Sequence, residues 1–357
     1  MKKERNIGID LLKIFAMIGV VALHYNNRSI GKAFLYAPLF SNKSYALYFV
    51  QSVFICAVNV FIMISGYFMA NTTKVNIKKP IRLLIQVVVF RELIYIVTAL
   101  CAGRQITAPN IFKFLLPQSW FAVLYVALYC LAPYLNRLIK SLSAKNFGIF
   151  VNLSFILFSI WPFTVDVLQE WTGMSFSGLS SIALSGSDSG YTLINFILAY
   201  LLGAAIRRKG DMGKLWANVT KLLLCWIILF VSAYLLESHG GNSKLIFSYC
   251  NPVVILCAVY LLRIFSCIKL RSNPVVTGIA AATFSVYLLN ATLIAELFDV
   301  EKYVKGNGFL MLLHMAWTCI AVCAMSYLAQ LLYDLITKPI YKLLDKWFPN
   351  NFCLNAE

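Results

Sequence analysis

Long apolar segments alternate with short polar ones along almost the whole chain. A helix that crosses the hydrocarbon core of a bilayer needs about 20 mostly apolar residues. Ten segments approach that length, and they cover residues 7–25, 45–70, 81–102, 120–139, 147–163, 191–206, 219–236, 247–265, 275–298 and 308–331. The pattern therefore predicts an all-α, polytopic membrane protein with about ten transmembrane helices. The fifth and sixth segments are short for a spanning helix.

The last apolar stretch, residues 332–348, has a different pattern. It places Lys338, Lys342, Asp345 and Lys346 among Leu, Ile, Tyr and Trp residues. Such a mixture is typical of an amphipathic segment that lies on a membrane surface. We therefore divide the chain into a transmembrane bundle, residues 1–331, and an amphipathic cytoplasmic tail, residues 332–357.

The composition supports a membrane protein. Of the 357 residues, 61% are hydrophobic and 13% are charged, whereas a soluble domain has about 45–50% apolar and about 25% charged residues. The formal net charge of +17 would suggest a nucleic-acid partner in a soluble protein. Here the basic residues do not alternate with aromatic residues on a soluble face, so no nucleic-acid partner is expected.

The basic residues predict the orientation of the chain. If the N-terminus is cytoplasmic and the ten spans alternate, 21 of the 31 Lys and Arg residues fall on the cytoplasmic side and 8 on the outer side. Cytoplasmic segments of membrane proteins carry such an excess. We expect both termini to be cytoplasmic and the protein to be a multi-pass protein of the cell (plasma) membrane, surrounded by membrane lipids.

Cysteine and histidine give no metal motif. The chain has 10 cysteines and 3 histidines, without a CxxC pair or the Cys/His spacing of a zinc site. Most of the cysteines lie inside or beside apolar segments, where they are expected to pack as small apolar residues. The sequence therefore predicts no metal cofactor.

Three ionisable residues of the first predicted span lie on one stripe of the helix. At 100° per residue, Lys13 and His24 differ by about 20° and Asp10 and His24 by about 40°, over a length of about 21 Å. Ionisable groups inside spans are costly and usually functional, which favours a buried polar site. Alternatively, Asp10 and Lys13 pair at the cytoplasmic interface while His24 marks the outer interface.

Basic and small polar residues follow in the next two spans. Ser65 precedes a glycine in the second span, where small residues also serve close helix packing. Lys78, Lys79 and Arg82 open the third span and either hold phosphate groups or mark the cytoplasmic side.

Three further features complete the set of candidates. Arg91 and Glu92 lie deeper in the third span and point in different directions, so each needs its own partner on another span. Tyr287 and Asn290 of the ninth span are three residues apart and share one helix face. The Ser- and Gly-rich loop 164–190 is either a flexible connector or a lid over a site.

Several of these segments follow one another in a characteristic order. IGIDLLKIFAMIGVVALHY contains a basic residue and, about ten residues later, a histidine; NVFIMISGYFM and KKPIRLL follow it. SWFAVLYVALYCLAPYLN, INFILAYLLGAAIRRKG and FSVYLLNA come later. Over roughly residues 5–300, this order resembles the acyltransferase-3 family of integral membrane O-acyltransferases.

The chain departs from the family pattern at three positions. Lys13 stands where the family usually has Arg, which keeps the charge but loses the planar fork of donors. Lys79 replaces the first Arg of the family's RxxR motif, and Arg82 keeps the second. Asn290 replaces a late His, so that position forms hydrogen bonds but does not titrate. His24, which is suited to proton transfer, is kept.

The resemblance implies an activity and a set of roles. The family transfers an acyl group, usually acetyl from cytoplasmic acetyl-CoA, to a hydroxyl of a cell-surface glycan or its lipid-linked precursor. It implies His24 as the base or acyl relay, Asp10 and Lys13 as residues that set its field and orientation, Lys78, Lys79 and Arg82 as the CoA site, and Ser65 as a donor to the thioester carbonyl. Since His24 lies near the outer end of its helix and Arg82 near the inner end, a re-entrant cavity or an acyl relay must join them.

Two other functions are compatible with the sequence. A transporter or exporter of a glycan or lipid-linked precursor would account for Arg91 and Glu92 within the membrane. A non-catalytic partner of polymer-synthesis proteins is the third possibility. The sequence leaves the oligomeric state open.

Overall fold

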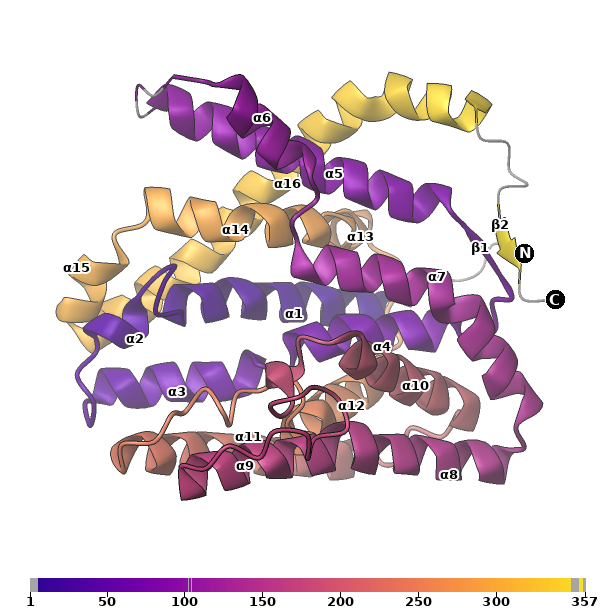
Figure 1. Ribbon diagram of the computed structural model, residues 1–357. Helices are drawn as coiled ribbons and strands as arrows, with labels where there is room; N and C mark the ends of the chain where they lie inside the picture. Colours follow the sequence, from indigo (N-terminus) through magenta and orange to yellow (C-terminus); the bar gives the residue numbers. More distant parts are fainter. Residues whose placement is uncertain (1–5, 102, 104, 348–352, 356–357) are drawn as a thin grey trace.

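The apolar segments form helices throughout the computed structural model, which describes residues 6–101, 103, 105–347 and 353–355 (Figure 1). The α-helices are α1 Ile7–Asn26, α2 Ala33–Tyr36, α3 Asn42–Phe54, α4 Ala57–Met69, α5 Lys78–Cys101, α6 Ala108–Leu115, α7 Trp120–Ser141, α8 Ala144–Phe155, α9 Trp161–Thr172, α10 Leu193–Lys209, α11 Leu215–Ser238, α12 Pro252–Ser266, α13 Pro274–Ala281, α14 Thr283–Leu297, α15 Val300–Lys305 and α16 Gly308–Trp347. A π-helical turn, Ile156–Ile160, joins α8 to α9, and a 3₁₀ turn, Asp188–Gly190, precedes α10.

Among the described residues, seven helical segments are long and apolar enough to cross a membrane. The pairs α3–α4 and α8–α9 each count as one segment, and α13 with α14 makes an eighth if they are read as a single span bent by 58°. Each of the ten predicted segments contains a helix, so the all-α, polytopic class is correct. However, α10 has 17 residues and α12 has 15, so a crossing by all ten stays a prediction. Residue 102, the predicted end of the third segment, lies outside the described residues.

The first helix occupies the centre of the bundle. Fourteen of the 20 residues of α1 are buried, and α1 packs against α3, α4, α12, α13, α14 and α16. Figure 1 shows α5, α6, α14 and α16 on one side of α1 and α3, α11 and α12 on the other. A helix buried on most of its faces must satisfy its polar side chains inside the protein. The ionisable residues of α1 therefore need partners within the bundle.

Both ends of the described chain lie at the same end of the bundle (Figure 1). There, strand β1, Lys74–Asn76, pairs antiparallel with β2, Cys353–Asn355. This placement agrees with an even number of crossings, while the side of the membrane stays a prediction. Helix α16 passes without a break from the predicted last span into the predicted tail and contains Pro339; residue 348, the predicted end of the amphipathic segment, lies outside the described residues.

Close packing of α4 on α10 explains the glycine that follows Ser65. A Cβ atom added at Gly66 would lie 2.1 Å from the carbonyl oxygen of Tyr200, and one at Gly203 would lie 2.1 Å from that of Met63. The two helix backbones therefore touch directly at these positions, as the small-residue interpretation of this motif predicts.

Candidate active site

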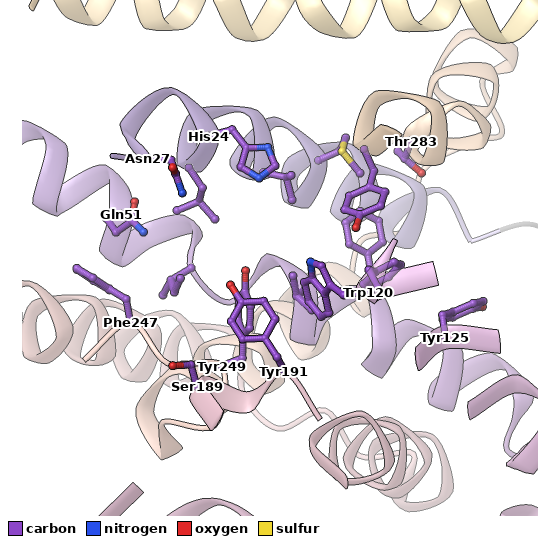
Figure 2. A pocket seen from close by; sticks show the side chains of 18 of the residues that line it. His24, Asn27, Gln51, Trp120, Tyr125, Ser189, Tyr191, Phe247, Tyr249 and Thr283 are labelled. Atoms are coloured by element: carbon purple, nitrogen blue, oxygen red, sulfur yellow. The ribbon is translucent and has the colours of Figure 1, made fainter. Parts of the chain in front are cut away.

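One cavity runs along α1 through most of the bundle. It has a volume of about 730 Å³, and its lining includes residues of α1, α3, α4, α5, α7, α13 and α14 and of the loops before α10 and α12. Lys13 lines one end, and Arg28, which follows the end of α1, lines the other. From Lys13 to Asn26 the helix rises by about 20 Å. His24 lies on its wall, across from Tyr191 and Tyr249 (Figure 2).

The structure brings His24 and Asn290 together from positions 266 residues apart. His24 Nδ1 forms a hydrogen bond with Asn290 Oδ1. The amide nitrogen of Asn290 donates to the carbonyls of Val286 and Tyr287, at 2.9 and 2.7 Å. Because only an amide nitrogen donates to a carbonyl, Asn290 offers its oxygen to His24. His24 Nδ1 therefore carries the proton, and the lone pair of Nε2 remains for a substrate.

Three aromatic side chains form the wall opposite His24 (Figure 2). The ring centroid of Trp120 lies 4.5 Å from that of Tyr191, edge to face, and 6.0 Å from that of Tyr249, stacked. Asn59 donates to the carbonyl of Tyr249 at 2.9 Å and so fixes this loop. Sequence analysis missed Tyr191 and Tyr249 as site residues, because both sit in loop segments whose approach to α1 depends on the fold.

The Asp10 and Lys13 side chains form an ion pair at the far end of the cavity. Lys13 Nζ lies 3.2 Å from Asp10 Oδ1, and Asp10 is buried. Lys13 also lines the cavity. Features of both interpretations are therefore present: Asp10 and Lys13 pair with each other, and Lys13 borders a buried cavity. His24 is about 16 Å of helix rise away. The pair is therefore too distant to orient the imidazole, and Asn290 takes that role.

Ser65 and Tyr125 face each other across the middle of the cavity lining. Their hydroxyl oxygens are 3.2 Å apart, and Ser65 Oγ also lies 3.2 Å from the carbonyl oxygen of Phe61. The Ser65 hydroxyl therefore donates to the backbone of its own helix, and both residues line the cavity. Tyr287, closer to His24, shares a hydrogen bond of 3.2 Å with Ser119 and also lines the cavity.

The basic residues at the start of α5 gather around one carboxylate. Asp345 Oδ1 lies 3.1 Å from Lys78 Nζ and 2.8 Å from Arg82 Nη2. The hydrogen bond from Lys78, together with the charge of Arg82, holds the pKa of Asp345 below its ordinary value. Lys79 is exposed. None of these residues lines the cavity; Leu83, which follows Arg82, does. The group thus lies beside the cavity rather than in it.

The contacts of Arg91 and Glu92 differ. The Arg91 guanidinium donates to the backbone carbonyl of Gln118 at 2.9 Å and to its side-chain oxygen at 3.1 Å, and so holds the linker that leads into α7. Both carboxylate oxygens of Glu92 are buried without a hydrogen-bond partner among the described residues. Neither residue lines the cavity along α1.

The other end of the cavity carries a second ion pair. Arg28 Nη2 lies 2.7 Å from Glu237 Oε1, and Lys244 also lines this end. The first part of the predicted loop 164–190 is helical, because α9 extends to Thr172. The rest of it contributes Ser189 to the lining, and the carbonyl of Ser189 accepts from the backbone N–H of Tyr249 at 2.9 Å. The loop is therefore part of the wall near the aromatic residues.

Comparison with known proteins assigns the family. Residues 6–333 match the acyltransferase-3 family, described as an acyltransferase domain. The chain therefore belongs to this family and is a membrane acyltransferase. No curated protein and no solved structure matches the chain. Within the described residues, no group of three His, Cys, Asp or Glu side chains is placed to hold a metal ion.

Proposed function

Starting from membership of this family, we propose that the protein transfers an acetyl or related acyl group from acyl-CoA to a hydroxyl of a cell-surface glycan or its lipid-linked precursor. The observation that carries this proposal is the hydrogen bond between His24 Nδ1 and Asn290 Oδ1. With Nδ1 as the donor, the neutral imidazole of His24 has its free lone pair on Nε2, and His24 lines a cavity large enough for a ligand.

The chemistry follows from that tautomer. The acceptor hydroxyl gives its proton to His24 Nε2, and its oxygen attacks the thioester carbonyl carbon. The resulting tetrahedral intermediate collapses with loss of the CoA thiolate, which takes the proton from the imidazolium. An ester bond forms, the thioester bond breaks, and His24 returns to its starting state. General-base catalysis of this kind contributes about 10²- to 10⁴-fold in rate.

The donor is expected to enter from the end of the cavity that Lys13 lines. The charge of Lys13 is balanced by Asp10, so the exposed Lys79 supplies the unbalanced positive charge near that end of the bundle. CoA carries phosphate groups that such charge attracts. Because Lys13 and His24 line one cavity, the thioester reaches the base within a single space. Ser65 lines this path, and to donate to the thioester carbonyl its hydroxyl must turn away from the carbonyl of Phe61.

The acceptor glycan is expected to use the aromatic wall. Trp120, Tyr191 and Tyr249 present flat apolar faces and hydroxyl groups together, and aromatic side chains with a polar handle suit partly polar ligands such as sugars. Arg28 and Lys244 line the neighbouring end of the cavity, and their charges suit the entry of a polar molecule there.

The test is His24→Ala in purified protein reconstituted in vesicles. We expect release of the CoA thiol from acetyl-CoA to fall by about 10²- to 10⁴-fold, and O-acetyl groups on the surface glycan of cells to disappear, while the variant still inserts and accumulates. Normal acetylation in this variant would remove His24 from the reaction. Export of a glycan precursor without CoA release by the unaltered protein would favour the transporter.

A further inference from the structure

A second cavity meets the first one at His24. It has a volume of about 630 Å³ and shares only His24, Trp120 and Tyr287 with the cavity along α1. The rest of its lining comes from α5, α6, α14, Ile30 after α1 and the linker before α7. These helices lie on the side of α1 opposite α3 and α11 (Figure 1). The candidate base is therefore reached from two directions.

The second cavity opens on an apolar surface. Lys113 of α6 lines the cavity and is itself exposed, so the cavity reaches the surface there. Helices α5 and α6 carry large apolar side chains on this surface, including Leu100, Phe112 and Leu115, which are 66%, 70% and 47% exposed. In a protein that crosses the membrane, such a surface contacts lipid chains.

The polar lining of this cavity is cationic. Arg91 and Lys113 line it together with the hydroxyl-bearing residues Tyr95 and Thr98, and no carboxylate occurs in the described lining. Arg91 is occupied by the linker, but its charge remains. Lys113 forms no ion pair with any residue that the structure describes. The Thr98 hydroxyl donates to the carbonyl of Ile94 at 2.8 Å, so the positive charge of Lys113 and Arg91 is the feature that suits a phosphate group.

From these observations we infer that the second cavity is a lateral entrance for a lipid-phosphate-linked acceptor. The lipid chain lies along the apolar faces of α5 and α6, the phosphate lies near Lys113 and Arg91, and the hydroxyl-bearing head group extends past Ser119 to His24. The inference rests on the proposed acyl transfer, because it names the class of acceptor and separates its entrance from that of the CoA donor.

The charge of Lys113 provides the test. Full-length protein in phosphatidylcholine nanodiscs is incubated with radiolabelled polyprenyl phosphate, and the label bound per protein is measured. We expect saturable binding that Lys113→Gln weakens about tenfold, as the loss of one charge-assisted contact implies, and that Lys113→Arg largely restores. Lys145→Gln, which removes an exposed lysine from α8, is the matched control and should bind normally.

Three results would overturn the inference. These are equal binding of uncharged polyprenol, displacement of the probe by inorganic phosphate at a matched concentration, and equal binding by Lys113→Gln. Equal binding of polyprenol would show that the site does not recognise the phosphate. Displacement by inorganic phosphate would show that it binds free phosphate without the lipid. A separate measurement of CoA release distinguishes this failure from failure of the proposed reaction. Release that depends on His24 without probe binding refutes only the lateral entrance, and probe binding without CoA release refutes only acyl transfer.

Discussion

Asn290 is expected to determine which nitrogen of His24 acts as the base. Its side-chain oxygen accepts from His24 Nδ1, and its nitrogen donates to two carbonyls of its own helix. Asn290→Leu keeps a similar volume and removes the acceptor. The carbonyls of Val286 and Tyr287 lose only an extra donor, since they sit inside α14, so the cost to the fold is small.

The magnitude follows from the charge that His24 gains during the reaction. A hydrogen bond between neutral groups contributes about 0.5–1.5 kcal/mol, and one to a charged group contributes about 1.5–3 kcal/mol. Only the increase on forming the imidazolium lowers the barrier. An increase of about 1.4 kcal/mol corresponds to about tenfold in kcat. Asn290 is not among the described residues that line either cavity, so the KM for acetyl-CoA should stay constant.

The assay is release of CoA thiol by protein in vesicles at several acetyl-CoA concentrations. Asn218→Leu, which changes a buried asparagine of α11 that donates to Met212, is the matched control and should keep its kcat if it folds. Combining Asn290→Leu with His24→Ala should add nothing to the effect of His24→Ala alone. An unchanged kcat in Asn290→Leu, or additive losses in the double variant, would refute the role of Asn290.

Two further predictions concern packing and the CoA end. Gly66→Ala places a methyl group against backbone, so we expect a loss of about 1–3 kcal/mol in stability, measured by thermal unfolding in detergent; Gly148→Ala, with open space at its Cβ, should not destabilise. Asp345→Asn frees Lys78 and Arg82 for CoA phosphates, so the KM for acetyl-CoA should fall by several-fold, and a rise would show that Asp345 positions these cations. Because the pKa of Asp345 is lowered, the ion pairs should hold at neutral pH, stay complete above the ordinary carboxyl pKa of about 3.9, and be lost only as the pH falls through the lowered folded-state pKa.

Periodicity and spacing predict those parts of the fold and site that depend on one helix. The long apolar segments become α1, α5, α7, α11 and α16, and the stripe of α1 becomes a cavity wall at Lys13 and His24. The prediction of a spanning helix is less well matched for the segments at 191–206 and 247–265, because α10 and α12 are short. Residues before α12 instead form the loop that carries Tyr249 to the site. Loop positions of this kind have no periodicity to reveal them.

Periodicity and spacing within one segment do not predict contacts between distant helices. The sequence marks Asn290 as a departure from its family, but only the fold places its oxygen on His24. The sequence likewise marks Arg91 as an intramembrane charge, and the structure assigns it to a linker because α6 turns back along α5 and brings Gln118 to the guanidinium. In both cases, the packing of the helices decides which residues meet. The pattern of residues within one segment carries no information about that packing.

The continuous cavity bears on how an acyl group travels between the two ends of the bundle. A covalent relay is needed where donor and acceptor cannot approach one base at the same time. Here the cavity along α1 joins Lys13 to His24, and the second cavity reaches His24 from the side of α5 and α6. Two routes that converge on His24 allow direct attack of the acceptor hydroxyl on the thioester. Direct transfer therefore needs no acyl-enzyme, and an acyl-protein trapped with acetyl-CoA in the absence of acceptor would contradict it.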